Sequence, residues 1–579
     1  KHVASSSSNA CKLLRSAGCL RAVLLSVGIQ FLLLTVFLLF VNFQLLHPFA
    51  WVMGTLRLVA SWYTWFASIP LIASVVLYGV VLCQQHLSER RYCPTRYRWL
   101  LHYGPRKVLF LCAHLLVGLL TAWLYTGYLH TDYQHLKYKC YGQDCISAYN
   151  VYLLGIGMTA GCYYFVSVHM RQEMSIEFPI VEQSRAEKMR ELLYASLAKS
   201  LVGSLLPTIS YTAVFCLFGP MVCHRLSHIL SVDMDERLGG FFGVATNVRL
   251  LFYGYLLTAQ ILSNMHLLRC FYSILLSEDL PLVVTKPRAA FAHEQEITLV
   301  AGLGVFNVYV VQCLAAHHFY KLALRKNSPQ RAEIFQLTEP GNRPASWRSL
   351  CDQCLSILGS FTEELIESMQ KISILKGAQT LPMPKITESL TTSLMAEKVL
   401  LQQYNQKHGI RPIVSPSREV AVDRPADGIP HFPNWCERVS TQLEQSIQRL
   451  IQRVPGIVYL FNEPEGAKTT FLLANSLPVV YITQALAQVC ASSLKEDPYG
   501  VVQNDLPAII KTINKLRNEL DKLSSVIGNM RTSSTSFNVL RCAVRRSLYA
   551  ICFRFSDYLD DLLPPGEELR QLQDLICQE

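Results

Sequence analysis

Six long apolar stretches in the first half of this 579-residue chain limit what it can fold into. Each has about the 20 residues that a helix needs to cross roughly 30 Å of hydrocarbon. They cover residues 22–43, 59–83, 108–129, 148–168, 201–223 and 248–276. The sequence therefore predicts an all-α protein. A polytopic bundle of about six transmembrane helices at 22–276 follows a short flank at 1–21 and precedes a mostly α-helical soluble domain.

The orientation of these spans follows from the lysines and arginines beside them. The flank at 1–21 and the second and fourth loops together carry fifteen basic residues, whereas the other three loops carry five. Loops rich in Lys and Arg stay on the cytosolic side. We therefore expect a cytosolic N-terminus and, because six spans are an even number, a cytosolic C-terminal half.

The C-terminal half divides into three predicted parts. They are a first helical block at 289–376, a proline-containing linker at 377–434 and a C-terminal helical domain at 435–579. Apolar stripes at helical spacing recur in the last part, for example from Ile509 to Leu523. A stripe from Leu540 to Leu559 has an opposing basic face, which leaves open partner or membrane-surface binding beside plain packing.

One further apolar run, residues 297–316, complicates the number of spans. It is long enough to cross a membrane and carries no charge, but it contains Gly302, Gly304, Asn307 and Gln312. We predict a buried helix of the soluble domain. The alternative, a seventh span, would place the C-terminal half in the lumen.

The spans themselves carry few groups that suggest transport. His114 is read as a packed, hydrogen-bonded side chain, with a proton relay as the alternative. Gly157 and Gly161 form a small-residue face suited to close helix packing, either inside the bundle or between copies of the chain. In the third loop, predicted to be lumenal, Cys140 and Cys145 are candidates for a disulfide.

Catalytic and ligand-binding motifs are weak throughout. Cys351-x-x-Cys354 lacks the second cysteine pair or histidines of a zinc site. The formal net charge of +11 is explained by basic residues beside the spans, and no nucleic-acid-binding motif appears. We therefore predict no enzyme activity, no cofactor, no metal and no direct nucleic-acid contact.

Ordered motifs along the chain resemble a known family. They include Leu46-His47-Pro48, Phe178-Pro179-Ile180, Phe335-Gln336-Leu337 with Trp347, and most clearly the segment with Pro498, Tyr499, Gly500, Val501, Val502 and Pro507. This pattern is similar to the transmembrane nucleoporins named for the nuclear division cycle, which belong to the membrane ring of the nuclear pore complex. The linker is shorter here than the Ser/Pro-rich insertion of the vertebrate relatives.

The resemblance implies a structural role in the nuclear envelope. Such proteins have six spans with both termini cytosolic, anchor the nuclear pore complex in the membrane and support pore assembly, on which nucleocytoplasmic transport of mRNA and protein depends. Their cytosolic domain binds aladin and membrane-apposed scaffold nucleoporins, and other pore-membrane proteins lie beside them. The alternative is a transporter or channel of the endoplasmic reticulum or nuclear envelope, which would show polar groups converging at the bilayer midplane.

Overall fold

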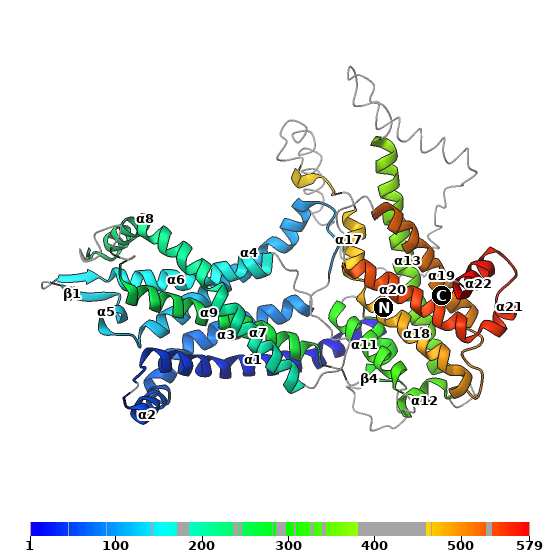
Figure 1. Ribbon diagram of the computed structural model, residues 1–579, viewed down its shortest axis with the longest axis horizontal. Coiled ribbons are helices and arrows are strands. Elements are labelled where there is room, and N and C mark those ends of the chain that lie inside the picture. The colour runs from blue at the N-terminus through cyan, green and yellow to red at the C-terminus, as the bar shows by residue number, and fades with distance from the viewer. Residues whose placement is uncertain are drawn as a thin grey trace, which may run out of the picture. The chain divides into compact units, whose positions relative to one another are not determined.

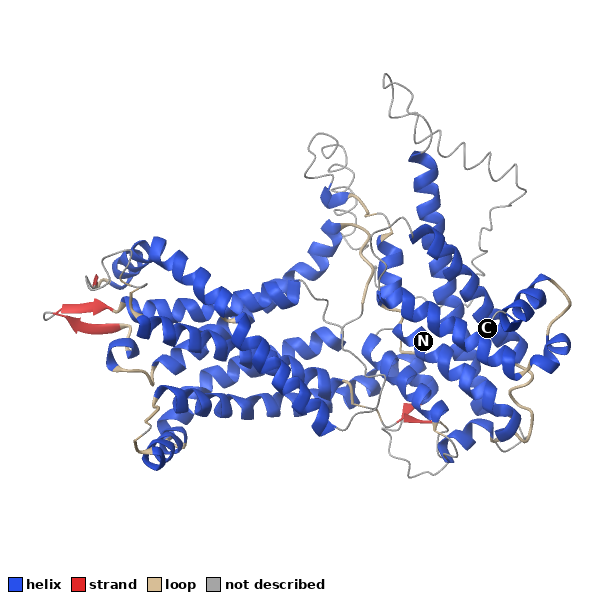
Figure 2. Cartoon of the chain, viewed as in Figure 1, coloured by secondary structure: helices blue, strands red, loops and turns tan. Residues whose placement is uncertain are grey.

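The fold comes from a computed structural model of the chain. It describes residues 2–44, 46–87, 90–140, 143–170, 185–234, 243, 246–278, 280, 282–284, 297–305, 308–325, 329–337, 343–379, 459–464, 466–527 and 535–577. Helices dominate these residues, and the strands among them are short (Figure 2). The predicted linker at 377–434 and the start of the predicted domain at 435 lie outside this description, apart from residues 377–379.

The N-terminal half is a bundle of long helices lying side by side (Figure 1). They are α1 (His2–Val41), α3 (Trp62–Leu87), α4 (Arg96–Thr126), α6 (Ala148–Tyr164), α7 (Arg185–Gly203), α8 (Leu205–Leu230) and α9 (Val248–Leu276). A π-helical turn, Phe165–Met170, extends α6. α9 packs against α1, α6 and α7, so it forms the centre of the bundle.

Six helical segments of the described chain are long and apolar enough to cross a membrane: Ser16–Val41, Trp62–Gln85, Arg96–Thr126, Ala148–Met170, Met189–Leu230, which covers most of α7 and all of α8, and Leu477–Glu496. The predicted class, a polytopic helical bundle followed by a helical region, is confirmed. α9 is absent from this set because inward-facing polar residues such as Gln260 and Asn264 lower its hydropathy. The last of the six, α18 (Leu477–Glu496), was not predicted as a span. It packs against α11 (Tyr309–Leu324) and α20 (Thr535–Arg554) of the C-terminal region.

The connections at one end of the bundle contain structure that the sequence did not indicate. Pro48, which follows the first span, begins a separate helix, α2 (Pro48–Val59). Proline suits the first helical position, where its missing N–H has no intrahelical partner. Farther along are α5 (Thr131–Gln134) and the hairpin of β1 (Lys137–Cys140) and β2 (Gln143–Ile146). β3 (Asp233–Met234) pairs parallel to β2, so the third and fifth loops meet.

The C-terminal region is a second group of helices. It contains α10 (Leu299–Leu303), α11, α12 (Pro329–Phe335), α13 (Ala345–Gln379), α17 (Ala467–Ala474), α18, α19 (Leu506–Ile527), α20, α21 (Leu559–Leu562) and α22 (Glu567–Cys577). Two short strands, β4 (Leu282–Val283) and β5 (Ile297–Thr298), pair in parallel before it. The predicted stripe from Ile509 to Leu523 is confirmed, since each of its apolar side chains is fully buried.

The prediction of a single helix over residues 297–316 is wrong. The chain there forms β5, the one-turn helix α10 and, after a break, the first half of α11. The side chain of Thr298 accepts a hydrogen bond from the Ala301 N–H and so caps α10. α11 has 16 residues and packs against α18. The apolar run therefore forms no continuous helix of spanning length.

By its internal contacts the chain divides into two units. One comprises Lys1–Pro94, Arg98–Leu365 and Lys468–Glu579, and thus holds both the bundle and most of the C-terminal region. The other comprises Thr95–Tyr97 and Ile366–Ala467. Within it, the Arg96 guanidinium lies 3.5 Å from the centre of the Tyr459 ring.

Candidate functional site

A pair of side-chain amides joins the first and last helices of the bundle. Gln30 of α1 donates to Oδ1 of Asn264 in α9 at 2.9 Å, and Asn264 donates back to Oε1 of Gln30 at 3.1 Å. Gln260, one helical turn earlier, donates to the Leu33 carbonyl at 2.6 Å. All three side chains are buried. Gln30 and Asn264 therefore satisfy each other's polar groups, and Gln260 finds a backbone partner, where water and lipid are excluded. None of the three side chains carries a charge, so a search for charged residues within the spans does not find them.

His114 lies in an aromatic cluster between α4 and α6. Its Nδ1 is 2.6 Å from the Phe110 carbonyl, to which it donates one turn back along its own helix. The rings of Tyr78, Tyr164 and His169 surround it at centroid distances of 4.7–5.6 Å. Among the described residues, no group of three His, Cys, Asp or Glu side chains could hold a metal ion.

The two predicted glycines lie where α6 meets α4. A Cβ atom built on Gly157 would lie 2.5 Å from the Cβ of Ala122 and 2.7 Å from the carbonyl oxygen of Gly118. One built on Gly161 would lie 2.3 Å from the carbonyl oxygen of His114. The two backbones therefore touch along this face, and only glycine permits their approach. The glycines face a helix of the same chain.

The two predicted cysteines lie in the hairpin at the end of the bundle. The strand register places Cys140 opposite Gln143, and Cys145 opposite Tyr138. Cys145 is buried, whereas the side chain of Cys140 is outside the described structure. A disulfide between them stays a prediction.

The motif that carries the family resemblance forms the turn between α18 and α19. The Asp497 carboxylate accepts hydrogen bonds from the N–H groups of Tyr499 and Val502, at 3.1 and 2.9 Å. Gly500 has φ +62°, a left-handed conformation that favours glycine. Val501 and Val502 are buried, Pro507 lies in the first turn of α19, and Pro498 and Tyr499 are exposed.

Two buried side chains attach this turn to neighbouring helices. The indole Nε1 of Trp347, from α13, donates to Oδ2 of Asp505 at 2.8 Å. Nε of Arg331, from α12, lies 2.8 Å from a carboxylate oxygen of Glu496. Both Trp347 and Arg331 are almost fully buried. The turn therefore fixes four helices relative to one another, a structural rather than a chemical task.

The loop between α3 and α4 contacts the C-terminal region directly. The Arg90 guanidinium lies 4.1 Å from the centre of the Tyr309 ring at the start of α11. The same group donates to Oδ1 of Asn475, just after α17, at 2.6 Å. The ring of Tyr92 lies 5.6 Å from that of Phe471. Stacking and a hydrogen bond together suit arginine better than lysine here.

The Cys351-x-x-Cys354 pair lies on the buried face of α13. Burial raises the pKa of Cys351 to about 12 and the pKa of Cys354 well above its usual 9.0. Both thiols therefore stay protonated at neutral pH, whereas a metal ligand or nucleophile is the thiolate. The pair packs as two small apolar side chains.

The comparisons with known proteins agree over the whole chain. The family described as nucleoporin protein Ndc1-Nup matches residues 19–573. Nucleoporin Ndc1 of Drosophila melanogaster is 93% identical over 576 residues, a coverage of 100% of each chain to the nearest per cent. Nucleoporin Ndc1 of Drosophila pseudoobscura pseudoobscura is 68% identical over 99% of each. Human nucleoporin NDC1 is 21% identical over 94% of each.

Apolar spans joined by buried amides and glycine contacts, followed by a packed helical region, define a multi-pass membrane protein. The chain belongs to the Ndc1-Nup family of nucleoporins. It is thus a nucleoporin with multiple membrane helices, a component of the nuclear pore complex in the pore membrane of the nuclear envelope.

Proposed function

We propose that the chain anchors the nuclear pore complex in the membrane, supports insertion of new pores, and recruits soluble scaffold nucleoporins, aladin among them, through its C-terminal region. The observation that supports this most is the backbone contact of α4 and α6 at Gly157 and Gly161. Helices packed this closely hold a fixed shape in lipid. The contact of Arg90 with Tyr309 and Asn475 joins that rigid bundle to the helices that would carry the scaffold.

The competing function is a transporter or channel of the endoplasmic reticulum or nuclear envelope. It needs polar groups that face a route for a solute. In the described bundle, Gln30 and Asn264 satisfy each other, and His114 is enclosed by aromatic rings. These contacts favour an anchor.

Depletion followed by rescue tests the anchoring role. Cells that lack the protein receive either the tagged full chain or a version ending at residue 284, and both are imaged with a pore marker and with aladin. We expect the full chain to give rim puncta and to restore aladin, and the truncated version to reach the envelope without restoring it. Diffuse reticular staining of the full chain contradicts the proposal.

The orientation is tested separately. An Asn-x-Thr glycosylation acceptor is inserted between β1 and β2, and the same acceptor is appended after residue 579 in a second version. A lumenal hairpin with a cytosolic C-terminus predicts glycosylation of the first version alone. The reverse result overturns the proposed orientation, and glycosylation of both indicates an odd number of spans.

A further inference from the structure

α2 presents an apolar face that no other part of the described chain covers. Phe49, Met53 and Leu56 follow one another at helical spacing and are exposed by 89%, 70% and 50%. Residues at this spacing lie on one face of a helix. The helix has 12 residues, about 18 Å at 1.5 Å per residue, and so cannot cross roughly 30 Å of hydrocarbon.

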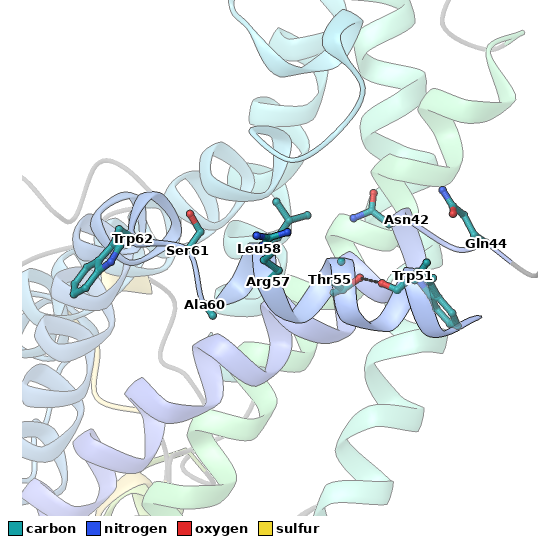
Figure 3. Close-up of a pocket in the computed structure, with 11 residues that line it drawn as sticks. Asn42, Gln44, Trp51, Thr55, Arg57, Leu58, Ala60, Ser61 and Trp62 are labelled. Atoms are coloured by element: carbon teal, nitrogen blue, oxygen red, sulfur yellow. Dashed lines mark hydrogen bonds between the residues drawn. The ribbon is translucent and has the colours of Figure 1, made fainter. Parts of the chain in front are cut away.

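The opposite side of α2 is fixed to the end of α1. The Trp51 indole donates to the Leu39 carbonyl at 3.1 Å, and its ring meets that of Phe43 edge-on at 5.0 Å. Thr55, one turn later, is buried and donates to the Trp51 carbonyl (Figure 3). α2 is therefore held at the place where α1 leaves the membrane and α3 enters it, with its apolar face turned outward.

A hollow of about 790 Å³ runs beside α2. Asn42 and Gln44 line one end, and Ser61 and Trp62 line the other, as Figure 3 shows. Arg57 lies between them and is the charged residue among those that line the hollow. The hollow thus combines polar donors, a cation and tryptophans. This combination is typical of protein surfaces at the depth of the lipid headgroups.

We propose that α2 lies in the interfacial layer of the bilayer, with its apolar face among acyl chains and a phospholipid headgroup in the hollow against Arg57. The apolar face fits the acyl chains because the spans on both sides of α2 are already in lipid. The guanidinium fits the phosphodiester, which accepts charge-assisted hydrogen bonds. An amphipathic helix of this kind lies in the interface plane.

Photo-crosslinking tests the apolar face. The full chain carries p-benzoyl-phenylalanine in place of Phe49 or Met53 and is reconstituted in nanodiscs of phosphatidylcholine and phosphatidylglycerol. The matched control carries it in place of Tyr558, an exposed aromatic of the C-terminal region. We expect phospholipid adducts at 49 and 53 and none at 558. No adduct at 49 and 53, or an adduct to a second chain there, overturns the proposal.

The hollow is tested by Arg57→Gln against Arg225→Gln, an exposed arginine near the end of α8. The full-length variants are partly delipidated, and retained phospholipid is measured by native mass spectrometry. Because R57Q loses one charge-assisted contact, we expect it to retain phospholipid about tenfold more weakly than the wild type. R225Q should retain phospholipid as the wild type does. Equal retention in both variants overturns the headgroup site. Displacement of the lipid by inorganic phosphate would show a free-anion site instead, and also overturns it.

Discussion

Trp347→Phe should destabilise the C-terminal region strongly, although both residues are aromatic and apolar. The indole is fully buried and donates to Asp505 at 2.8 Å. A hydrogen bond to a charged group contributes about 1.5–3 kcal/mol, and the smaller ring leaves a void beside the carboxylate. We expect a loss of roughly 2–3 kcal/mol, which lowers the Tm of a unit of this size by about 5–10 °C.

Thermal unfolding of the detergent-solubilised full chain measures this loss. Unfolding is monitored with a maleimide that becomes fluorescent when it reacts with exposed thiols. Cys354, Cys490 and Cys552 are buried in the region concerned and report its unfolding. The matched control is Trp99→Phe, because Trp99 is 42% exposed. It should change the Tm little, as surface substitutions usually stay within about 0.5 kcal/mol.

A double-mutant cycle with Asp505→Asn isolates the hydrogen bond from the loss of packing. Because Trp347 and Asp505 contact each other, the effects of the two substitutions should be non-additive by about 0.5–3 kcal/mol. Additive effects, or a Tm of Trp347→Phe equal to that of the wild type, would refute the role assigned to this contact.

Three further outcomes follow from described contacts. Gly157→Leu should lower the Tm of the bundle or abolish its folding, because even a Cβ there would lie 2.5 Å from Ala122. Gly500→Ala should cost roughly 1 kcal/mol, because φ +62° is unfavourable for alanine, and denaturant unfolding measures the cost. Burial raises the pKa of Cys313 to about 12, so its contribution to stability is complete below pH 9, the unfolded value, and is lost as pH rises toward 12. Melting curves of wild type and Cys313→Ala at pH 8 and pH 10.5 should converge at the higher pH.

Each of these has a matched control. Gly28→Leu in α1 should be tolerated, because a Cβ there meets nothing within 4 Å. Gly359→Ala in α13 should raise stability by about 0.5–1 kcal/mol, since alanine is the better helix former, so the two glycine-to-alanine changes differ in sign. Cys542→Ala removes an exposed thiol and should leave the pH dependence of the melting curve unchanged.

The apolar stretches could be predicted from the sequence because burial in lipid acts on each segment independently. Long-range contacts could not. Gln30 and Asn264 are 234 residues apart, and the sequence around each residue gives no sign that the two pair. Likewise, apolar content alone does not separate α18, which packs among helices, from a span. Gln260 and Asn264, which lower the hydropathy of α9, lie on the face that packs against α1.

Local signals were partly misread. Pro48 after the first apolar stretch is a helix-start signal that was not used to predict α2. Asp497-Pro498-Tyr499-Gly500 was valued only for its family resemblance. An aspartate three residues before a glycine also predicts a turn closed by its own side chain, which is what the structure shows. Residues 297–316 were predicted as one helix because they are apolar and uncharged. The cap at Thr298 and the glycines Gly302 and Gly304 are the local signals for the short helix α10 that the structure shows instead.

The contact of Arg90 has a mechanical consequence. A domain connected to a membrane bundle by one strand of chain can swivel about that strand when a load pulls on it. The loop between α3 and α4 supplies a further point of attachment through Tyr309 and Asn475, and α1 also contacts α10 and β5, so these contacts together restrict such rotation. Tension applied to the C-terminal helices is then shared between the connection after α9 and the ends of two other spans.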